Sequence, residues 1–398
     1  MAFPLQGVRI ISVEQYGAGP FGTMQLADLG AEIIKIENAG EGGDVGRQVR
    51  HPDDPLPVGD SMFHQAFNRN KRSITLNLKS DEGQQILHRL VAGADAVFNN
   101  LRGDLPAKLG LTYGTLGEIN EKIVCVHLSA YGRNNEREGW PGYDYLMQAE
   151  CGYLAVTGEP DGPPSRVGLS LVDLSTGLQA AIALSSGIIG ARTSGTGGDY
   201  DVSLFDAAIA NLCYVGAWYL TAGINTTRIK RSAHPNLTPS QLYRTRDGWI
   251  FIMCNKEKFW PELCTAIARP DLAENRDYVD FAARLSNRDQ LTTVLDEILS
   301  DRTTGEWLTV FAGKVPAAPV NDIASALDNP FAHDSGQIIS FDAPDGTTVT
   351  TTGPAIRLPD VRPLANPAPL LAGDLEDVMA EIGIDAAQID ALKARGVL

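Results

Sequence analysis

Residues 8–37 constrain the fold more than any other stretch of the chain. Residues 8–13 and 32–37 are short runs rich in Ile and Val, which is typical of buried strands. Between them, the glycine-rich turn at 17–22 leads into a helix that Gly30 ends. A strand, a helix and a strand joined this closely predict a βαβ unit with parallel strands and a right-handed crossover.

Strands and helices keep alternating farther along the chain. Strands are predicted within residues 67–79, 95–98, 123–128 and 197–206, and helices from about 80 to 92 and from about 105 to 110. This alternation predicts an open, mostly parallel, Rossmann-like α/β sheet. Ligands bind such sheets at the carboxyl ends of the strands, so we expect the functional site there.

The chain of 398 residues is long enough for two domains. Asp247-Gly248 joins two apolar runs, which is a strong hairpin signal, and amphipathic helices follow it. We therefore predict a small α+β domain at 226–325 and a large α/β domain formed by 1–222 with 326–398. In the C-terminal part we expect a hairpin at 341–356, a coil at 359–373, a last helix at 375–382 and a short tail.

The net charge of −16 argues against a nucleic-acid surface, which needs a basic stripe to neutralise phosphates. The five cysteines are scattered, without a CxxC pair or a metal-binding spacing, which is typical of a reducing compartment. No export signal is visible at the N-terminus. The uncharged stretches 174–191 and 207–227 contain Thr and Gly, so we expect buried helices there rather than membrane spans. Together these features predict a cytoplasmic protein.

The turn at 17–22 also matches the dinucleotide-binding pattern G-x-G-x-x-G. Glu37 follows about twenty residues later, where an acidic residue binds a ribose hydroxyl in such sites. Pro20, however, removes one of the N–H groups that would hold a pyrophosphate. An NAD(P)-dependent oxidoreductase therefore remains a distant alternative.

Asp173 interrupts an otherwise apolar stretch, 167–177, that we predict to be a short buried strand. A helix rich in small residues is expected to follow at 178–191. An aspartate at such a corner has two interpretations. It caps the helix by accepting a backbone N–H, or it is a catalytic carboxylate in a partly dry site, acting as a nucleophile or a base.

Eight motifs follow one another along the chain. They are 16–20 (YGAGP), 26–37 (LADLGAEIIKIE), Gly43-Asp44 with Arg47, 68–73 (NRNKRS), 108–111 (KLGL), Tyr131-Gly132, Asp173 with Gly177, and His234-Pro235. Taken together in this order, they resemble the class III CoA-transferases of the CaiB/BaiF type, the family of formyl-CoA:oxalate and carnitine CoA-transferases. The resemblance extends over most of the chain.

The resemblance implies that Asp173 is the nucleophile. In that family the reaction proceeds through an acyl-aspartyl anhydride and an aspartyl-CoA thioester, and it uses no metal and no cofactor beyond the CoA thioester. The resemblance also implies an interlocked homodimer in which each chain forms an open ring threaded by the other. The partners implied are an acyl-CoA donor and a carboxylic acid acceptor, with no nucleic acid and no membrane.

The resemblance also predicts a CoA groove in the large domain. The residues expected to contact CoA are Gly17 and Ala18 near the thioester, Lys71 and Arg72 near the phosphates and adenine, and Asn100 and Lys108 along the same groove. This chain departs from the family where a Gln is replaced by Gly17 and where basic residues of some members are replaced by Asn38 and Ser129. A glycine loop that shields the intermediate in the oxalate enzyme is not apparent.

The nearest alternative within the superfamily is an α-methylacyl-CoA racemase. Such an enzyme pairs its Asp with a His, because its acid and base must each hold a proton. Tyr143 stands at the position of that His, and tyrosine has an ordinary pKa of about 10. We therefore favour transfer over racemisation, and we expect structural roles for His127 and His234.

Cations near Asp173 in the sequence suggest the class of acid. Arg166, together with Arg228, Lys230 and Arg231, is a candidate for binding a second carboxylate, and Tyr143 is a candidate contact for the acyl group. On this basis we expect a C4–C5 dicarboxylate such as succinate, mesaconate, citramalate or itaconate. The alternative is that these cations are ordinary surface or CoA-phosphate groups, which leaves a monocarboxylate or a carnitine-like acid open as the substrate. A protein that binds CoA without catalysis is a further alternative for the function.

Overall fold

The computed structural model describes residues 2–359 and 361–398, so Asp360 of the predicted 359–373 coil lies outside the described residues. The chain divides into two compact units. The first comprises Met1–Cys151, Gly168–Cys213 and Phe331–Leu398, and the second comprises Gly152–Val167 and Tyr214–Pro330.

Residues 152–167 belong to the second unit, although the sequence prediction included them in the large domain. Arg228 explains this grouping, because its guanidinium donates to the backbone carbonyls of Glu159, Gly162 and Pro163. The sequence predicted a large domain of 1–222 with 326–398 and a small domain of 226–325. That these domains fold independently remains a prediction.

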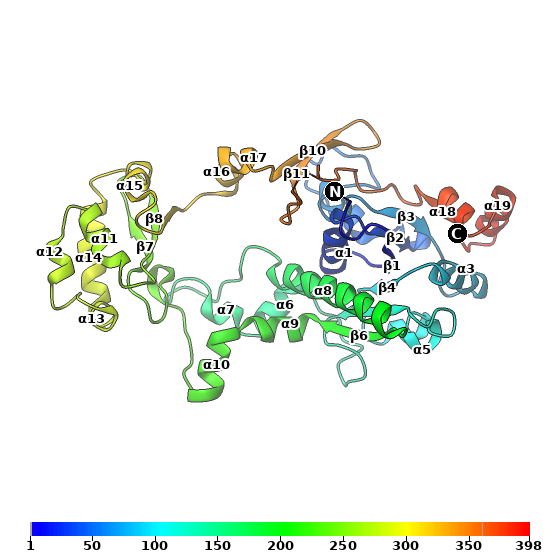
Figure 1. The fold of residues 1–398 in the computed structure, drawn as a ribbon, viewed down its shortest axis with the longest axis horizontal. Helices are drawn as coiled ribbons and strands as arrows, with labels where there is room; N and C mark the ends of the chain where they lie inside the picture. The colour runs from blue at the N-terminus through cyan, green and yellow to red at the C-terminus, as the bar shows by residue number, and fades with distance from the viewer. Residues whose placement is uncertain (1, 360) are drawn as a thin grey trace. The chain divides into compact units, whose positions relative to one another are not determined.

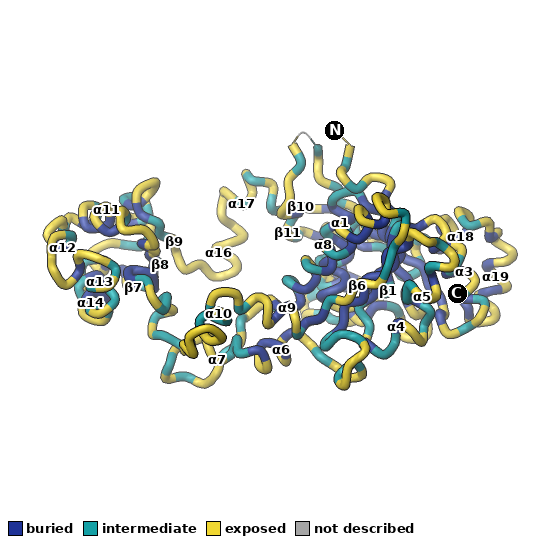
Figure 2. Tube along the Cα trace, turned by 60° about the horizontal axis from the view of Figure 1, so that its bottom comes forward, coloured by how far each residue is buried: buried dark blue, intermediate teal, exposed yellow. Residues whose placement is uncertain are grey.

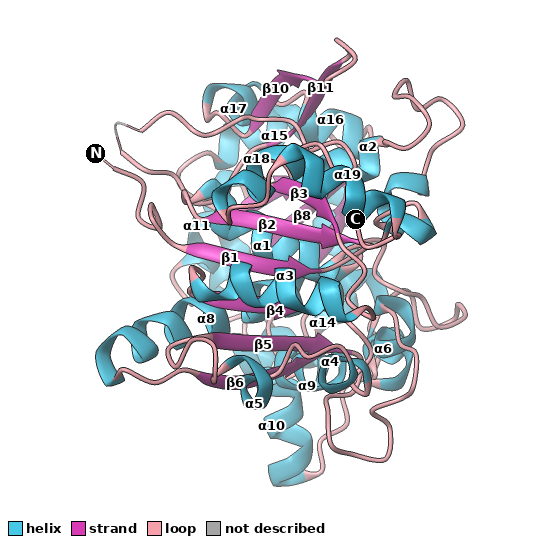
Figure 3. Cartoon of the chain, turned by 90° about the vertical axis from the view of Figure 1, so that its right-hand side faces the viewer, coloured by secondary structure: helices cyan, strands magenta, loops and turns pink. Residues whose placement is uncertain are grey.

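The first unit is built on a six-stranded parallel sheet, which confirms the predicted fold class (Figure 3). Its strands are β1 (Arg9–Val13), β2 (Glu32–Glu37), β3 (Arg72–Thr75), β4 (Ala96–Asn99), β5 (Val124–Ser129) and β6 (Gly198–Ser203), in the order β3-β2-β1-β4-β5-β6. The order reverses between β1 and β4. Loops leave these two strands in opposite directions, so a crevice opens between them at the carboxyl edge.

Helices cover both faces of this sheet (Figure 3). On one face lie α1 (Ala18–Asp28) and α8 (Leu171–Ser194), and on the other lie α3 (Asp81–Ala92), α18 (Leu375–Glu381) and α19 (Ala386–Ala394). The apolar core on the second face joins Ile34 of the sheet to Leu87 and Val378 of the helices. This unit also contains α2 (Met62–Asn68), α4 (Leu105–Lys108), α5 (Tyr113–Leu116), α6 (Asp144–Glu150), α9 (Leu204–Asn211), the short 3-10 helices η1 (Ala39–Glu41) and η2 (Val45–Gln48), and the hairpin of β10 (Ile338–Asp342) and β11 (Thr348–Thr352).

The C-terminal part confirms the hairpin and the last predicted helix, but the prediction of a short tail after residue 382 was wrong. That tail contains α19, which begins with a capping box between Asp385 and Gln388.

The prediction of a short strand at 167–177 was also wrong, because α8 already begins at Leu171 and runs for 24 residues. Helix α8 lies beside α1 (Figure 1), and a glycine on each helix permits the close approach. A Cβ atom on Gly177 would lie 2.4 Å from the carbonyl oxygen of Ala18, and one on Gly22 would lie 2.4 Å from that of Gly177. Such distances leave no room for a side chain at either position.

Among the described residues, α8 is also the one helix long and apolar enough to cross a membrane. Its most apolar window is 44% buried, and the helix packs on α1 and β5. Packing within the sheet layers therefore accounts for part of its apolar character, while Leu178, Ile182 and Ile189 stay exposed in the single chain.

The second unit contains a three-stranded antiparallel sheet of β7 (Ser240–Arg244), β8 (Trp249–Met253) and β9 (Ala317–Pro319). The hairpin predicted at Asp247-Gly248 is confirmed. Its helices are α7 (Tyr153–Val156), α10 (Cys213–Ala222), α11 (Phe259–Ala266), α12 (Asp271–Glu274), α13 (Phe281–Ser286), α14 (Arg288–Leu299), α15 (Thr304–Phe311) and α16 (Ile323–Leu327), while α17 (Pro330–Asp334) follows the unit boundary.

The uncharged stretch 207–227 does not form one buried helix, as the sequence had predicted. It is divided between α9 and α10 at Cys213, whose φ is +43°. No residue of α10 is buried in the single chain, and Leu220 is 85% exposed (Figure 2). The apolar character of α10 therefore has no explanation within the contacts of one chain.

Candidate active site

Two adjoining hollows lie at the carboxyl edge of the parallel sheet. The larger has a volume of about 550 Å³ and the smaller about 200 Å³, and Gln15 and Leu101 line both. The larger is bordered by residues that end or follow four strands, Val13, Glu37, Leu76 and Leu101. The hollows therefore form one groove at the position that the strand order predicts.

The smaller hollow brings together five of the predicted site residues from distant parts of the chain. They are Gly17, Ala18, Asn100, Tyr143 and Asp173. A Cβ atom on Gly17 would lie 3.1 Å from Oδ2 of Asp173, so this glycine leaves space in front of the carboxylate. Asn100 fixes the preceding turn, because its side chain accepts the N–H of Gln15 and donates to the carbonyl of the same residue.

Asp173 is not the N-cap of α8, so that interpretation of the sequence was wrong. Ser170 occupies the cap position, and Asp173 lies in the first turn. Its side chain is 6% exposed in a pocket wall of the first unit. Burial, and then the negative charge of Asp144, raise the pKa of Asp173 to about 7. A carboxylate stripped of water in this way is more basic and more nucleophilic than an exposed one.

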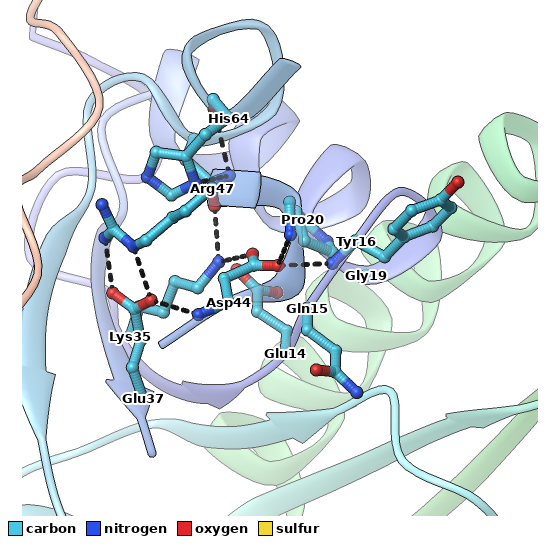
Figure 4. Close-up of polar contacts among 12 residues, drawn as sticks. Glu14, Gln15, Tyr16, Gly19, Pro20, Lys35, Glu37, Asp44, Arg47 and His64 are labelled. Atoms are coloured by element: carbon cyan, nitrogen blue, oxygen red, sulfur yellow. Dashed lines mark hydrogen bonds and ion pairs between the residues drawn. The ribbon is translucent and has the colours of Figure 1, made fainter. Parts of the chain in front are cut away.

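Tyr16 connects this pocket to a buried network of charges (Figure 4). Its φ of +68° is unusual for a residue with a side chain, and its N–H donates to Oδ1 of Asp44 over 2.8 Å. Its ring packs against Phe63 and Tyr143. Burial and the charge of Asp173 raise the pKa of the Tyr16 hydroxyl, so it stays protonated beside the carboxylate.

The network beneath Tyr16 pairs buried charges of opposite sign. Asp44 forms an ion pair with Lys35, and its N–H donates to Glu37. Arg47 donates to both oxygens of Glu37, at 2.6 and 2.9 Å (Figure 4). Burial alone would raise the pKa of Glu37, but the bonds from Arg47 and the charge of Lys35 lower it to about 2. The motif Gly43-Asp44 with Arg47, quoted above only for resemblance, thus has a structural role.

The same contacts correct the dinucleotide interpretation. Both oxygens of Glu37 are engaged, one by Arg47 and the N–H of Asp44 and the other by Arg47 and the hydroxyl of Ser73. The carboxylate is buried and has no free oxygen to offer a ribose hydroxyl. The distant alternative of an NAD(P) site at 17–22 is therefore wrong.

Lys71 and Arg72 are not brought into the groove. Lys71 is fully buried, and its ammonium donates to the carboxylate of Glu14 over 2.8 Å and to the carbonyl of Pro20. Burial lowers the pKa of Lys71 to about 8. Arg72 begins β3 and pairs with Glu32 and Glu381 at the amino edge of the sheet. The predicted contacts of these two cations with CoA therefore have no support in the structure.

A different lysine reaches the groove from the same strand. Lys79, which follows β3, is exposed and lines the larger hollow. Lys108 lies on the exposed side of α4, where it pairs with Asp104, while Leu105 and Leu109 line the larger hollow. The direction of β3 was the signal that distinguishes Lys79 from Arg72, because parallel strands bring only their carboxyl ends to the site.

The cations proposed to bind a second carboxylate belong to the second unit. There, Arg231 pairs with Asp296 at 2.6 Å, and Arg228 is bound by backbone carbonyls. Arg166 donates to the carbonyl of Val167. Contacts of these residues and of Lys230 with an acyl group remain a prediction.

The remaining predicted groups have local partners. His127 lies buried in β5 between Asn99 and Asp199. His234 stacks on Tyr214 in the second unit. Within the described residues, no three His, Cys, Asp or Glu side chains are grouped to bind a metal ion.

Because its pKa is raised, Asp173 should make the stability of the folded protein depend on pH. The ordinary value is 3.8, so the folded state retains this proton over a range of pH in which the unfolded state has lost it. The anion therefore destabilises the fold as the pH rises from about 4 to about 7, by at most about 4 kcal/mol. Asp173→Asn should match the Tm of the wild type near pH 4 and exceed it by several degrees above pH 7.

Thermal unfolding followed by fluorescence at a series of pH values tests this prediction. Asp81→Asn is the matched control, because Asp81 is an exposed aspartate in the first turn of α3. The opposite trend, with Asp173→Asn less stable at high pH, would contradict the raised pKa.

Comparison with known proteins identifies the family. The profile described as CoA-transferase family III matches residues 5–374. Human succinyl-CoA:glutarate CoA-transferase is 32% identical over 401 residues, which cover 99% of this chain and 90% of the human protein. Succinyl-CoA:mesaconate CoA-transferase of Haloarcula marismortui is 32% identical over 392 residues, which cover 96% of this chain and 97% of that protein. The crystal structure of a CaiB/BaiF family protein from Brucella suis has a TM-score of 0.82 at 30% identity and covers 96% of this chain and 100% of its own. The chain belongs to CoA-transferase family III.

Proposed function

We propose that this CoA-transferase exchanges CoA between dicarboxylic acids, with Asp173 as the covalent carrier. The observation that carries the proposal is the position of Asp173, a buried carboxylate of raised pKa at the end of a groove on the carboxyl edge of the sheet. Gly17, without a side chain, leaves an approach to that carboxylate for a thioester carbon.

The lining of the groove supports a CoA site. The nucleotide is assigned to the larger hollow, where Leu76 and Leu78 offer apolar surface and Lys79 offers positive charge. The pantetheine then passes Gln15 and Leu101, which line both hollows, and brings its sulfur to Asp173. Lys79 supplies charge locally, which the chain needs because its net charge is −16.

The first half of the reaction loads the enzyme with CoA. An oxygen of Asp173 attacks the thioester carbon of the donor, the carbon–sulfur bond breaks, and CoA leaves as the thiolate. The thiolate then attacks the aspartyl carbonyl of the resulting anhydride, and the donor acid leaves as its carboxylate. The product is an aspartyl-CoA thioester, and no water or external proton is consumed.

The second half runs the same steps in reverse. The acceptor carboxylate attacks the aspartyl-CoA thioester, which releases the thiolate and forms a new anhydride with Asp173. The thiolate attacks the acceptor carbonyl, which restores the Asp173 carboxylate. Burial of Asp173 supports this scheme, because bulk water would hydrolyse either intermediate.

Dicarboxylates are favoured by the names of the two relatives above, which act on succinyl-CoA with glutarate or mesaconate. A second carboxylate needs a cation. Within the described lining of the smaller hollow that cation is Arg102, whose guanidinium also pairs with Asp104. Arg166, Arg228, Lys230 and Arg231 remain the candidates from the second unit.

Racemisation has less support than transfer. Tyr143 lines the smaller hollow, and no histidine is among the described residues of that lining. A racemase needs a second group that exchanges a proton near neutral pH, which tyrosine does poorly.

We also propose that the enzyme is a cytoplasmic homodimer. The exposed apolar residues of α10, including Tyr219 and Leu220, support a partner chain. The family resemblance supplies the interlocked form.

Covalent loading tests the mechanism and the substrate class in one experiment. Wild-type protein incubated with succinyl-CoA and quenched in acid should gain the mass of CoA less one water on Asp173, because the thioester replaces the carboxyl oxygen. Adding glutarate or mesaconate before the quench should remove the label, whereas butyrate should not. Freshly purified Asp173→Asn should carry no label, while Asp81→Asn should behave as wild type.

Persistence of the label in Asp173→Asn would refute the assignment of the nucleophile. Discharge by butyrate as fast as by glutarate would refute the dicarboxylate specificity alone. No label in the wild type, with exchange of the α-proton of a 2-methylacyl-CoA, would support the racemase.

A pair of charge variants tests the direction of the groove. Lys79→Gln should raise the KM for acyl-CoA about tenfold, because a charge-assisted phosphate contact contributes about 1.5 kcal/mol. Arg72→Gln removes one positive charge from the same strand but at its amino edge, so the KM should not change. Steady-state kinetics with succinyl-CoA measure both KM values. A raised KM in Arg72→Gln with an unchanged KM in Lys79→Gln would assign the phosphate contact to Arg72 instead.

A further inference from the structure

Asp144 is a second buried carboxylate next to the nucleophile. It begins α6 and is 3% exposed. Its Oδ2 accepts the backbone N–H of Asp173 over 2.9 Å, and its Oδ1 accepts the side-chain amide of Gln148 over 2.6 Å. The same amide also donates to the carbonyl of Leu169. Both oxygens of Asp144 are therefore fixed, one of them on the backbone of the nucleophile itself.

Helix α8 depends on this contact for its start. The first backbone N–H groups of a helix have no partner within it, and a side chain at the cap position usually accepts one of them. Ser170 holds that position in α8 and makes no such bond. Asp144, from another helix, accepts the N–H of Asp173 instead. The first turn of α8 is thus held in place from α6.

Capping alone does not explain why this residue is charged. Ser or Asn caps a helix about as well as Asp, whereas a buried carboxylate beside another one is unfavourable for both. The other ionisable groups around Asp173 do not offset that charge. Those that line the pocket are Tyr16, Tyr143 and Arg102, which pairs with Asp104. On α9, a helix packed against α8, Asp206 is bonded to Ser203. Burial and Asp144 together raise the pKa of Asp173.

We propose that Asp144 is a positioning residue for the transfer reaction, which holds the Asp173 backbone in the first turn of α8 and keeps a negative charge beside the reacting carboxylate. The inference rests on the proposed role of Asp173 as nucleophile. Its chemical consequence is that Asp173 attacks the thioester as a more basic carboxylate than an isolated aspartate, at the expense of a smaller ionised fraction below pH 7.

Variants at this position separate charge from geometry. Asp144→Asn removes the charge and keeps an oxygen for the Asp173 N–H. Asp144→Glu keeps the charge and displaces the carboxylate by one methylene group. Asp144→Ser, a second neutral residue able to accept the N–H, replaces the Asn variant if that protein does not fold. Asp81→Asn, in the first turn of α3, is the matched control for the loss of one charge.

The measurement is kcat/KM for succinyl-CoA and glutarate from pH 5 to 9. The rising limb reports ionisation of Asp173 in the free enzyme. In Asp144→Asn or Asp144→Ser this limb should move to lower pH by about one unit, because a like charge has been removed. In Asp144→Glu the limb should stay in place while kcat falls about tenfold or more. Asp81→Asn should change neither quantity.

The inference and the proposed function fail differently. If the wild type forms the aspartyl-CoA label but the limb of both neutral variants coincides with that of the wild type, Asp144 is only a helix cap and the inference is overturned. If the wild type forms no label, the proposed nucleophile fails and the inference fails with it.

Discussion

The close contact between α1 and α8 is the constraint on which the site depends. Gly22 and Gly177 meet at this crossing, where neither position has space for a Cβ atom. The contact brings the turn that begins α1 to the first turn of α8, so that Gly17 faces Asp173. One pair of glycines thus joins the start of the parallel sheet to a residue more than a hundred positions away in the sequence.

The electrostatics of the pocket follow from that packing. Asp173 and Asp144 share a dry corner, whereas the charges beneath Tyr16 are arranged in pairs: Lys35 with Asp44, and Arg47 with Glu37. The paired charges hold a left-handed turn at Tyr16, whereas burial and the like charge of Asp144 raise the pKa of Asp173. Paired buried charges therefore hold the backbone beside the pocket, whereas the carboxylate of Asp173 is the group that we propose to carry the chemistry.

Local sequence pattern predicted the sheet because the strands β1, β2, β4 and β5 are mainly apolar runs closed by a turn, as in 32–37. The local pattern failed at the start of α8. The apolar residues before Asp173 suit a strand as well as a helix, and the helix is instead stabilised by its packing against α1. The pattern also could not place Lys71 and Arg72. Residue type identifies a cation, but it reveals neither the buried ion pair of Lys71 with Glu14 nor the amino edge of the sheet on which Arg72 lies. Asp144 was missed because its partner, Asp173, is distant in sequence.

The most direct test of the central claim follows oxygen atoms through Asp173. An acceptor acid labelled with oxygen-18 in its reacting carboxylate forms the bridging oxygen of the second anhydride, and attack of the thiolate on the acceptor carbonyl leaves that oxygen on Asp173. Mass spectrometry of the peptide containing Asp173 after turnover should therefore show oxygen-18 in its side chain. Complete transfer of CoA with no oxygen-18 in that peptide would contradict an aspartyl intermediate.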